Sequence, residues 1–593
     1  MDPHASTSER HASTESRSAP PIDTTPSATP PDPSGGGSGM SPLRSYLAEA
    51  AGDDQSSLWE PVNRRHATTS WTSVTEDRVL IDHLLGLYFC WEYPIFSTLS
   101  KEHFMHDLAQ GGTKYCSALL VNAILALGCR FSDRPEARAD AAYGATTGDH
   151  FFREARRLLT QEFQPTLTTV QALGLMSIRE ASCGRDGAGY LFSIRSMGMA
   201  LELGLHLSGG TTAPGTPSAI ELDARSVTFW GCFNLHHAWS LWAGRLPQVV
   251  RAAIGVRKPF LVAEREHELW TPYVGEGEQP QSGFQQRSHV RSVQICLCQL
   301  SELINETLFA LYASDQPVTG RELVRHYTRR LEWHGALPEA LRLGENSTPS
   351  VLTVHMYYHL SILLLFRPFL SFNIRHSTIS PRVACAEAAS SISSVLSTYR
   401  SLYTFRRVPF IVPHIVLGAT IVRLLDPGAT EAPAALVQGV EALTEIRACD
   451  VFADYALDVF HFHAQRLGLA VVRRAKGLIL ISLPPQPRAP FGDPRARSML
   501  AMARDASGAA DDGAAGRWGF TSAAPLFSPC THQSVPLSFP VPTLRKTAVD
   551  GADPGGWTTE SMLSNGFELA FSRRDEDDDD DDDNDDSDME DVS

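Results

Sequence analysis

Apolar side chains recur one helical turn apart through about four hundred residues of this chain, roughly residues 72 to 482, and this spacing constrains the fold more than any other feature. Leu80, Leu84, Leu87 and Trp91 show the pattern in the first such segment. Alternation with a period of two, which is typical of strands, is not sustained in this region. The predicted fold class is therefore all-α, as an irregular multi-helix domain rather than a strict repeat.

Capping residues and glycines predict where individual helices begin and end. Ser73 and Glu76 have the spacing of a capping box, Asp149 is expected to cap a later helix, and Gly128 is expected to end one. Residues 168–184 and 189–207 are predicted to form a helix pair joined by a glycine-rich turn. Further helices are predicted at Ala224–Leu246, His289–Ala313, Thr319–His334, Thr353–Leu370, Val383–Phe405, Pro413–Leu425, Ala434–Cys449 and Ala453–Ala470.

Composition divides the chain into four parts. Residues 1–71 are rich in Ser, Pro, Thr and Gly and are predicted to be disordered, because they cannot bury enough apolar surface to fold. The helical domain is predicted at residues 72–482, followed by a Pro/Gly/Ala-rich linker with short apolar motifs at 483–572. Residues 573–593 are an acidic tail, whose self-repulsion opposes folding.

The formal net charge of −17 comes mostly from the acidic tail, which holds 14 acidic residues from Asp575 onward. The residues before Asp575 sum to only about −3, so they offer no strongly basic surface for nucleic acid. Ten cysteines are scattered through the sequence and none forms a C-x-x-C pair. This pattern favours buried free thiols over disulfides or a metal knot.

The stretch "HMYYHLSILLLFRPFL", His355 to Leu370, allows three interpretations: a membrane anchor, a metal site or a packing helix. Its longest unbroken apolar run has five residues, which is too short to span a bilayer. His355 and His359 share one helical face, but position 356 is Met rather than the Glu of an H-E-x-x-H hydrolase, and no third ligand is near in sequence. A packing helix is therefore expected, with no membrane segment.

The sequence contains no convincing motif for catalysis or for binding a metal or nucleotide. No catalytic, cofactor-binding or metal-binding residue is therefore predicted, and the chain is not expected to be an enzyme. His461 and His463 are two positions apart and point away from each other on a helix. The glycines at 184, 187 and 189 have the wrong order for a dinucleotide fingerprint. No Gly-Lys dipeptide or G-x-S-x-G elbow occurs, and aspartate-rich clusters are confined to the tail.

Five stretches, in this order along the chain, resemble the middle homology region of fungal binuclear zinc-cluster transcription factors, of the xylanolytic-activator and nitrate-assimilation type. They are residues 84–104, 116–133, 168–207, 229–249 and 354–370, within a span of about 72–425. The resemblance implies an all-helical regulatory domain that controls RNA polymerase II-dependent gene expression in the nucleus. The resemblance also implies partners. These are DNA, the transcription machinery or coactivators, and a second copy or a zinc-cluster protein in a homo- or heterodimer.

One departure from the family pattern is that residues 1–89 contain no cysteine, whereas the family's zinc cluster needs six. DNA binding and zinc are thus implied by the family only, and no cofactor is expected in this chain. Two alternatives stay open: an upstream exon encodes the cluster, or the chain is a non-DNA-binding helical scaffold or inhibitor of a zinc-cluster partner. Basic pairs at Arg64-Arg65 and Arg473-Arg474 are weak import signals.

The acidic tail suits an activation segment, because such segments mix acidic residues with bulky apolar groups. Phe567, Leu569 and Phe571 lie just before the acidic run. Residues 561–593 are therefore expected to form an activation segment.

Overall fold

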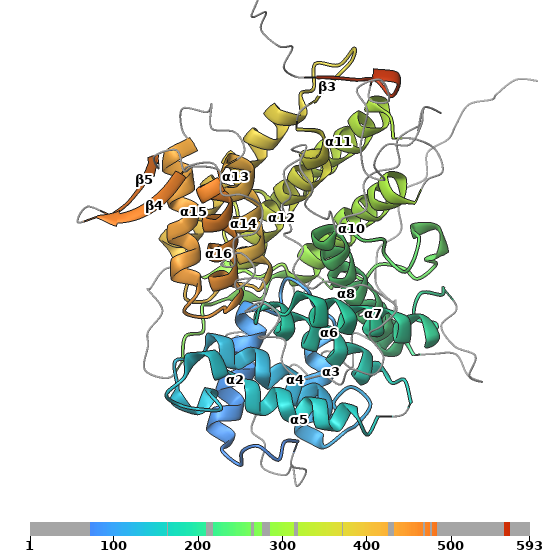
Figure 1. The fold of residues 1–593 in the computed structure, drawn as a ribbon. Coiled ribbons are helices and arrows are strands. Elements are labelled where there is room, and N and C mark those ends of the chain that lie inside the picture. The colour runs from blue at the N-terminus through green and yellow to red at the C-terminus, as the bar shows by residue number, and fades with distance from the viewer. Residues whose placement is uncertain are drawn as a thin grey trace, which may run out of the picture. The chain divides into compact units, whose positions relative to one another are not determined.

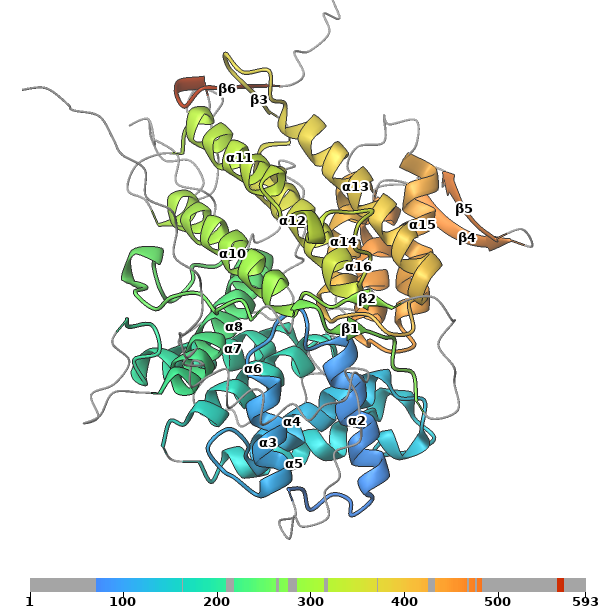
Figure 2. The same cartoon turned by 180° about the vertical axis from the view of Figure 1, so that it is seen from behind.

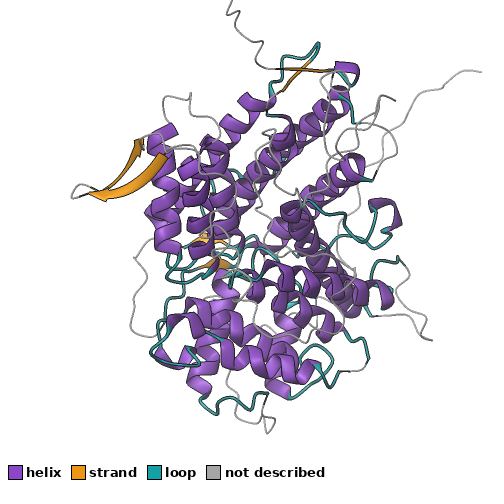
Figure 3. Cartoon of the chain, in the orientation of Figure 1, coloured by secondary structure: helices purple, strands orange, loops and turns teal. Residues whose placement is uncertain are grey.

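The computed structural model describes residues 71–482, apart from residues 163, 209–217, 263–265, 276–284, 314–317, 371, 425–431, 467–468 and 475–476, together with residues 563–569. The described residues form fourteen α-helices and six short strands. Helices dominate the chain in Figure 3. The predicted all-α fold class is confirmed.

The first half of the domain is a set of seven helices around α4. They are α2 (Arg78–Trp91), α3 (Lys101–Gln110), α4 (Ala118–Gly128), α5 (Asp149–Leu159), α6 (Leu167–Ala181), α7 (Asp186–Glu202) and α8 (Ala219–Ala243), with 3-10 turns η1 (Cys129–Phe131), η2 (Pro135–Ala137), η3 (Gly144–Thr146) and η4 (Arg251–Ala253). Every residue of α4 after its first is buried, and α4 packs on α2, α5 and α6. Figure 1 shows these helices grouped together.

The second half is a set of seven helices around α12. They are α10 (Val290–Tyr312), α11 (Gly320–Gly335), α12 (Pro349–Phe366), α13 (Pro381–Tyr403), α14 (Ile411–Leu424), α15 (Ala432–Ile446) and α16 (Phe452–Arg466), with 3-10 turns η5 (Glu339–Leu341) and η6 (Arg367–Phe369). Helix α12 contacts α8, α10, α11, α13 and α14. Because α8 and α10 also contact each other, these three helices join the two halves.

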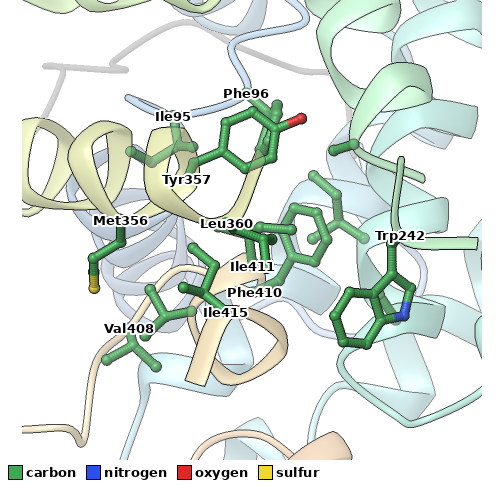
Figure 4. Close-up of a cluster of buried hydrophobic side chains, with 14 of the residues drawn as sticks. Ile95, Phe96, Trp242, Met356, Tyr357, Leu360, Val408, Phe410, Ile411 and Ile415 are labelled. Carbon is green, nitrogen blue, oxygen red and sulfur yellow. The ribbon is translucent and has the colours of Figure 1, made fainter. Parts of the chain in front are cut away.

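Helix α12 contains the stretch for which the sequence allowed three interpretations. By length and composition alone, Pro349–Phe369 is apolar enough to cross a membrane, but 89% of its apolar window is buried inside the protein. Figure 4 shows Tyr357 and Leu360 of α12 among side chains from both halves, including Phe96 and Phe410. The Phe96 and Tyr357 ring centroids are 6.3 Å apart. This burial supports the interpretation of a packing helix.

Two predicted helix caps are wrong. Asp77, not Ser73, caps α2, because its carboxylate accepts hydrogen bonds from the backbone amides of Val79 and Leu80. Gly148 precedes α5 in the left-handed conformation, where a Cβ would lie 2.4 Å from the Ala126 carbonyl oxygen. Asp149 is instead the first residue of α5.

Other predicted boundaries are confirmed. Helix α4 ends at Gly128, and α6 and α7 pack together as the expected pair around the turn at Gly184, whose φ is +69°. Helix α11 begins with a complete capping box between Thr319 and Glu322. Helix α3 is not among the predicted helices, because this short helix carries few apolar residues.

Six short strands form three antiparallel pairs that the helical spacing did not predict. They are β1 (Leu269–Trp270) with β2 (Gln286–Arg287), β3 (Phe372–Ile374) with β6 (Phe567–Leu569), and β4 (Leu469–Arg474) with β5 (Gly477–Ser482). The helix predicted to end at Ala470 ends at Arg466. The sequence that follows contains valine and isoleucine, which favour strands, and it forms the hairpin β4–β5. Figure 2 shows β6 beside β3 and the hairpin beside α15.

The predicted four-part division is described only in part. The helical domain of residues 72–482 corresponds to the described helices and the hairpin. The disordered segment at 1–71 lies outside the described residues except for Trp71, and so does the linker at 483–572 except for residues 563–569. The acidic tail at 573–593 lies wholly outside them.

Candidate functional site

A buried cluster of one arginine and two carboxylates joins distant parts of the chain. Arg130, in η1 at the end of α4, lies between Glu92, which follows α2, and Asp450, which lies between α15 and α16. Its Nη1 is 2.7 Å from Glu92 Oε2 and its Nη2 is 2.6 Å from Asp450 Oδ2. All three residues are at most 3% exposed. We call these three residues the charge triad.

The charge triad holds one guanidinium against two carboxylates, so full ionisation leaves one buried negative charge uncompensated. Burial raises the pKa of Glu92 to about 7, although the attraction of Arg130 partly opposes this rise. Burial likewise raises the pKa of Asp450 to about 6, again opposed by Arg130. The triad therefore favours a bound proton near neutral pH.

A second set of arginines clamps the turn that carries Arg130. Arg406 donates to the Arg130 and Ser132 carbonyl oxygens at 2.9 and 3.0 Å. Arg407 donates to the Phe131 carbonyl oxygen at 3.1 Å, and both arginines pair with Asp133. The backbone that positions Arg130 is therefore held by the segment just before α14, so the triad and the clamp connect the two halves of the domain.

The charge triad is not among the sites predicted from the sequence. Arg130 and Glu92 lie in stretches that carry the family resemblance, but Asp450 lies beyond that span. A charged residue inside the apolar run "AILALGCRF" is a usable signal, because a buried arginine needs a partner. The identity of the partner, 320 positions away, is not encoded in any local pattern.

The two histidines considered as metal ligands lie beside a third. His334 of α11 places its Nε2 3.2 Å from Nδ1 of His355, and its ring 6.1 Å from that of His359. A third histidine, distant in sequence, therefore lies close in space, because α11 packs on α12. Since His355 Nε2 lies 2.9 Å from the Leu341 carbonyl oxygen, this nitrogen carries the proton and Nδ1 accepts from His334.

This histidine cluster is uncharged at neutral pH. Burial lowers the pKa of His334 to about 4 and that of His359 to about 3, with a smaller repulsion from the neighbouring histidines, and burial also lowers the pKa of His355. Among the described residues, no group of three or more His, Cys, Asp or Glu side chains is arranged to hold a metal ion. His463 is buried on α16 and His461 is half-buried.

The described cysteines are free thiols, and most of them are buried, as the sequence predicted. Only Cys90 and Cys183 are partly exposed. Burial raises the pKa of the Cys90 thiol to about 12, so this thiol is protonated at neutral pH. The described thiols therefore have the character of core side chains.

An exposed basic strip runs along α5, where Arg153, Arg156 and Arg157 face solvent. Arg157 pairs with Glu154 on the same helix at 2.7 Å. Arg153 and Arg156 border a shallow cavity of about 370 Å³ that also includes Asp149 and Glu180. Its mixed charge favours neither an anion nor a cation.

The short apolar motif near the C-terminus returns to the helical domain. Residues 563–569 form a turn and strand β6, which pairs antiparallel with β3 beside the start of α11. Phe567 is fully buried and stacks on Phe369, with ring centroids 5.0 Å apart. Two of the apolar residues predicted to serve activation, Phe567 and Leu569, therefore lie in this docked segment, whereas Phe571 lies outside the described residues.

Comparison with protein families identifies the domain. Residues 85–343 match the family described as "Fungal specific transcription factor domain". The match begins within α2, extends past the end of α11, and includes Glu92 and Arg130 of the charge triad. This part of the chain is a domain of that family, as the resemblance predicted. The class of domain is that found in fungal-type transcription regulators.

Curated relatives carry names of the same class. The chain is 38% identical over 424 residues to nitrogen assimilation transcription factor nirA of Emericella nidulans, which covers 69% of this chain and 47% of the relative. It is 37% identical over 398 residues to nitrogen assimilation transcription factor nit-4 of Neurospora crassa, covering 64% and 36%. Notoamide biosynthesis transcriptional activator notL' of Aspergillus versicolor is 26% identical over 386 residues, covering 60% and 59%. The chain thus spans less than half the length of the first two relatives.

Proposed function

We propose that this chain regulates transcription of nitrogen assimilation genes through protein contacts of its helical domain, acting in the nucleus. The observation that carries the proposal is the family match at residues 85–343, together with 37–38% identity to two relatives that are both named nitrogen assimilation transcription factors. The charge triad supports a role for the domain as one cooperative unit, because it ties the matched region to α15 and α16.

The same proposal assigns no catalysis and no cofactor to the chain. The histidine cluster, the cysteines and the charge triad are all explained by burial and mutual hydrogen bonding, so they serve the stability of the domain. DNA binding belongs to the proposal only through the family, with a zinc cluster as the element that would contact DNA. The lack of a zinc cluster, which we expect because residues 1–89 contain no cysteine, stays a prediction.

An activation segment at residues 561–593 completes the proposal. Its composition, with 14 acidic residues after Phe567, Leu569 and Phe571, fits a segment that binds a coactivator groove. Fusing residues 561–593 to a heterologous DNA-binding domain tests this part. A reporter signal several-fold above that of the DNA-binding domain alone is expected, and a signal equal to it would contradict an activation segment.

A tethering experiment with the full chain tests the main proposal. The full chain, fused to a heterologous DNA-binding domain, is expected to change reporter output by several-fold. Arg130→Met disrupts the charge triad and is expected to weaken the response, whereas Arg157→Ala, on the exposed face of α5, serves as the control. Unchanged reporter output with the fusion present in the nucleus would contradict regulation of transcription.

A further inference from the structure

Strand β6 binds the helical domain through its backbone. Phe372, Asn373 and Ile374 of β3 stand opposite Leu569, Glu568 and Phe567 of β6 in an antiparallel register. The Arg375 amide donates to the Gly566 carbonyl oxygen at 2.9 Å, and the Gly320 amide donates to the Asn565 carbonyl oxygen at 3.0 Å. Gly320 is the first residue of α11, so its amide has no partner within the helix and is satisfied by the docked segment instead.

One side chain anchors the docked segment. The Phe567 ring is fully buried, lies nearly parallel to the Phe369 ring at an angle of 10°, and contacts the Phe372 ring edge-on at 6.5 Å. Ile374, opposite Phe567 in the register, is also buried. Glu568, the next residue of β6, is exposed. Phe567 of β6 therefore faces the domain and Glu568 faces the solvent, as in strand addition to an exposed edge.

Two glycines make the close approach possible. A Cβ on Gly320 would lie 2.9 Å from the Gly566 carbonyl oxygen and 2.7 Å from a methyl group of Ile374. Gly566 has a φ of +84°, which favours glycine. It ends a turn in which its own amide donates to the Leu563 carbonyl oxygen. The domain thus accepts an Asn-Gly-Phe sequence in one backbone conformation.

We propose that β3, the first turn of α11 and the Phe369 ring form a peptide-docking site, whose ligand is the chain's own segment Leu563–Leu569. Only three residue pairs form the ladder, so the segment can leave without unfolding a helix. About eighty residues, 483–562, lie between the hairpin β4–β5 and the segment, so the segment is tethered covalently and its return to the site is intramolecular.

Charge complementarity favours the chain's own segment over other ligands. Arg321, Arg325 and Arg375 are exposed and flank the site, with Arg375 also bonding the segment through its backbone. The acidic run begins at Asp575, six residues after Leu569. The sequence that follows the docked segment therefore has the opposite charge to these arginines, and this complementarity favours the segment as the ligand.

Docking has a consequence that rests on the proposed activation segment. The activation segment combines acidic residues with bulky apolar ones, and docking buries Phe567. A coactivator that needs this ring therefore binds only after β6 leaves the site, so the docking equilibrium sets how much of the segment is available.

Hydrogen–deuterium exchange on the full chain tests the site directly. Phe567→Ala removes the anchor, and Gly320→Ala adds a Cβ that clashes with the Gly566 backbone. Each is expected to speed exchange at Gly320, Arg375 and residues 563–569 by about tenfold or more, while α12 stays protected. Glu568→Ala, on the exposed side of β6, is the matched control and is expected to leave exchange unchanged.

Rescue by a peptide separates a docking site from a fixed part of the fold. A synthetic peptide of residues 561–571, added at about 1 mM to the full-length Phe567→Ala chain, is expected to restore protection at Gly320 and Arg375. The same peptide with Phe567→Ala, or the wild-type peptide on a Gly320→Ala/Phe567→Ala chain, is expected to restore none.

Two results would overturn the docking site. The first is unprotected exchange at Gly320, Arg375 and residues 563–569 in the wild-type chain. The second is failure of the wild-type peptide to restore protection. The fusion of residues 561–593 to a heterologous DNA-binding domain reports separately on activation, since a silent reporter with intact exchange protection contradicts the activation segment and leaves the docking site supported.

Discussion

Arg130 and Asp450 are 320 positions apart in the sequence, yet Arg130 Nη2 lies 2.6 Å from Asp450 Oδ2 in the protein interior. Glu92 completes the charge triad from a third part of the chain. The contact joins α4, at the centre of the first half, to the link between α15 and α16 in the second. A change that weakens the triad should therefore lower the stability of both halves together.

Arg130→Met should lower the free energy of unfolding by about 3–5 kcal/mol, because it leaves two buried carboxylates without their cation. Arg330→Met is the matched control. Arg330 is also buried, but it bonds to Thr307, Ser361 and the His326 carbonyl oxygen, with no carboxylate partner among the described residues. Its replacement should therefore be much less costly.

Urea unfolding followed by tryptophan fluorescence compares the two arginine variants. An equal loss of stability in Arg130→Met and Arg330→Met would show that the triad's carboxylates contribute nothing specific.

The charge triad should make stability fall as pH rises. The pKa of Glu92 is raised from 4.5 to about 7 and that of Asp450 from 3.8 to about 6, so the folded state holds protons that the unfolded state releases. The stabilisation is fully present below about pH 4 and is lost as pH rises through about 7. Each carboxylate contributes on the order of 3 kcal/mol.

Asp450→Asn isolates this pH dependence. The variant leaves one cation and one carboxylate, so the pKa of Glu92 should fall, although burial keeps it above its ordinary value. Asparagine replaces one of two acceptors with a donor, which lowers stability at every pH, but the loss between pH 4 and 7 should be smaller than in the wild type. Parallel curves of unfolding free energy against pH for the two proteins would contradict a shared proton in the triad.

The histidine cluster should have the opposite pH dependence. Burial lowers the pKa of His355, so its stabilisation is present above about pH 6.5 and is lost as the pH falls below that value. His355→Leu should cost about 1–3 kcal/mol at pH 7, since the Leu341 carbonyl oxygen and the His334 N–H lose their partner. His355→Gln keeps a neutral donor and should cost less.

Calorimetric melting at pH 5 and pH 7 measures the contribution of His355. Both variants should lose less stability on acidification than the wild type does. An unchanged difference between the two pH values would rule out His355 as a titrating group in this range.

Gly231→Ala should destabilise the protein even though alanine favours helices. A Cβ at this position of α8 would lie 2.1 Å from the Ser97 carbonyl oxygen and 2.7 Å from Thr98 Cα, both backbone atoms that cannot rotate away. The expected cost is about 1–3 kcal/mol. Gly187→Ala is the control, because nothing lies within 4 Å of its Cβ position, and it should be neutral or stabilising by up to about 1 kcal/mol.

Thermal unfolding of the two glycine variants gives the comparison. Equal melting temperatures would mean that α8 does not approach residues 97–98 as closely as the structure shows.

Local spacing predicted most helices because a turn-by-turn apolar pattern depends only on neighbours within the helix. The prediction from local spacing was wrong where two residues could cap the same helix. Asp77, not Ser73, caps α2 through its carboxylate. The prediction also failed where the partner is distant. The Arg130–Asp450 contact, the approach of His334 to His355 and the docking of Phe567 on Phe369 depend on packing between elements, which no sequence window contains.

Transcript abundance in a strain that lacks this chain tests the proposed function most directly. After a change of nitrogen source, transcripts of nitrogen assimilation genes should fail to respond by several-fold, and the wild-type chain should restore the response while Arg130→Met restores it poorly. A normal response without the chain would contradict its role as a transcription regulator of nitrogen assimilation.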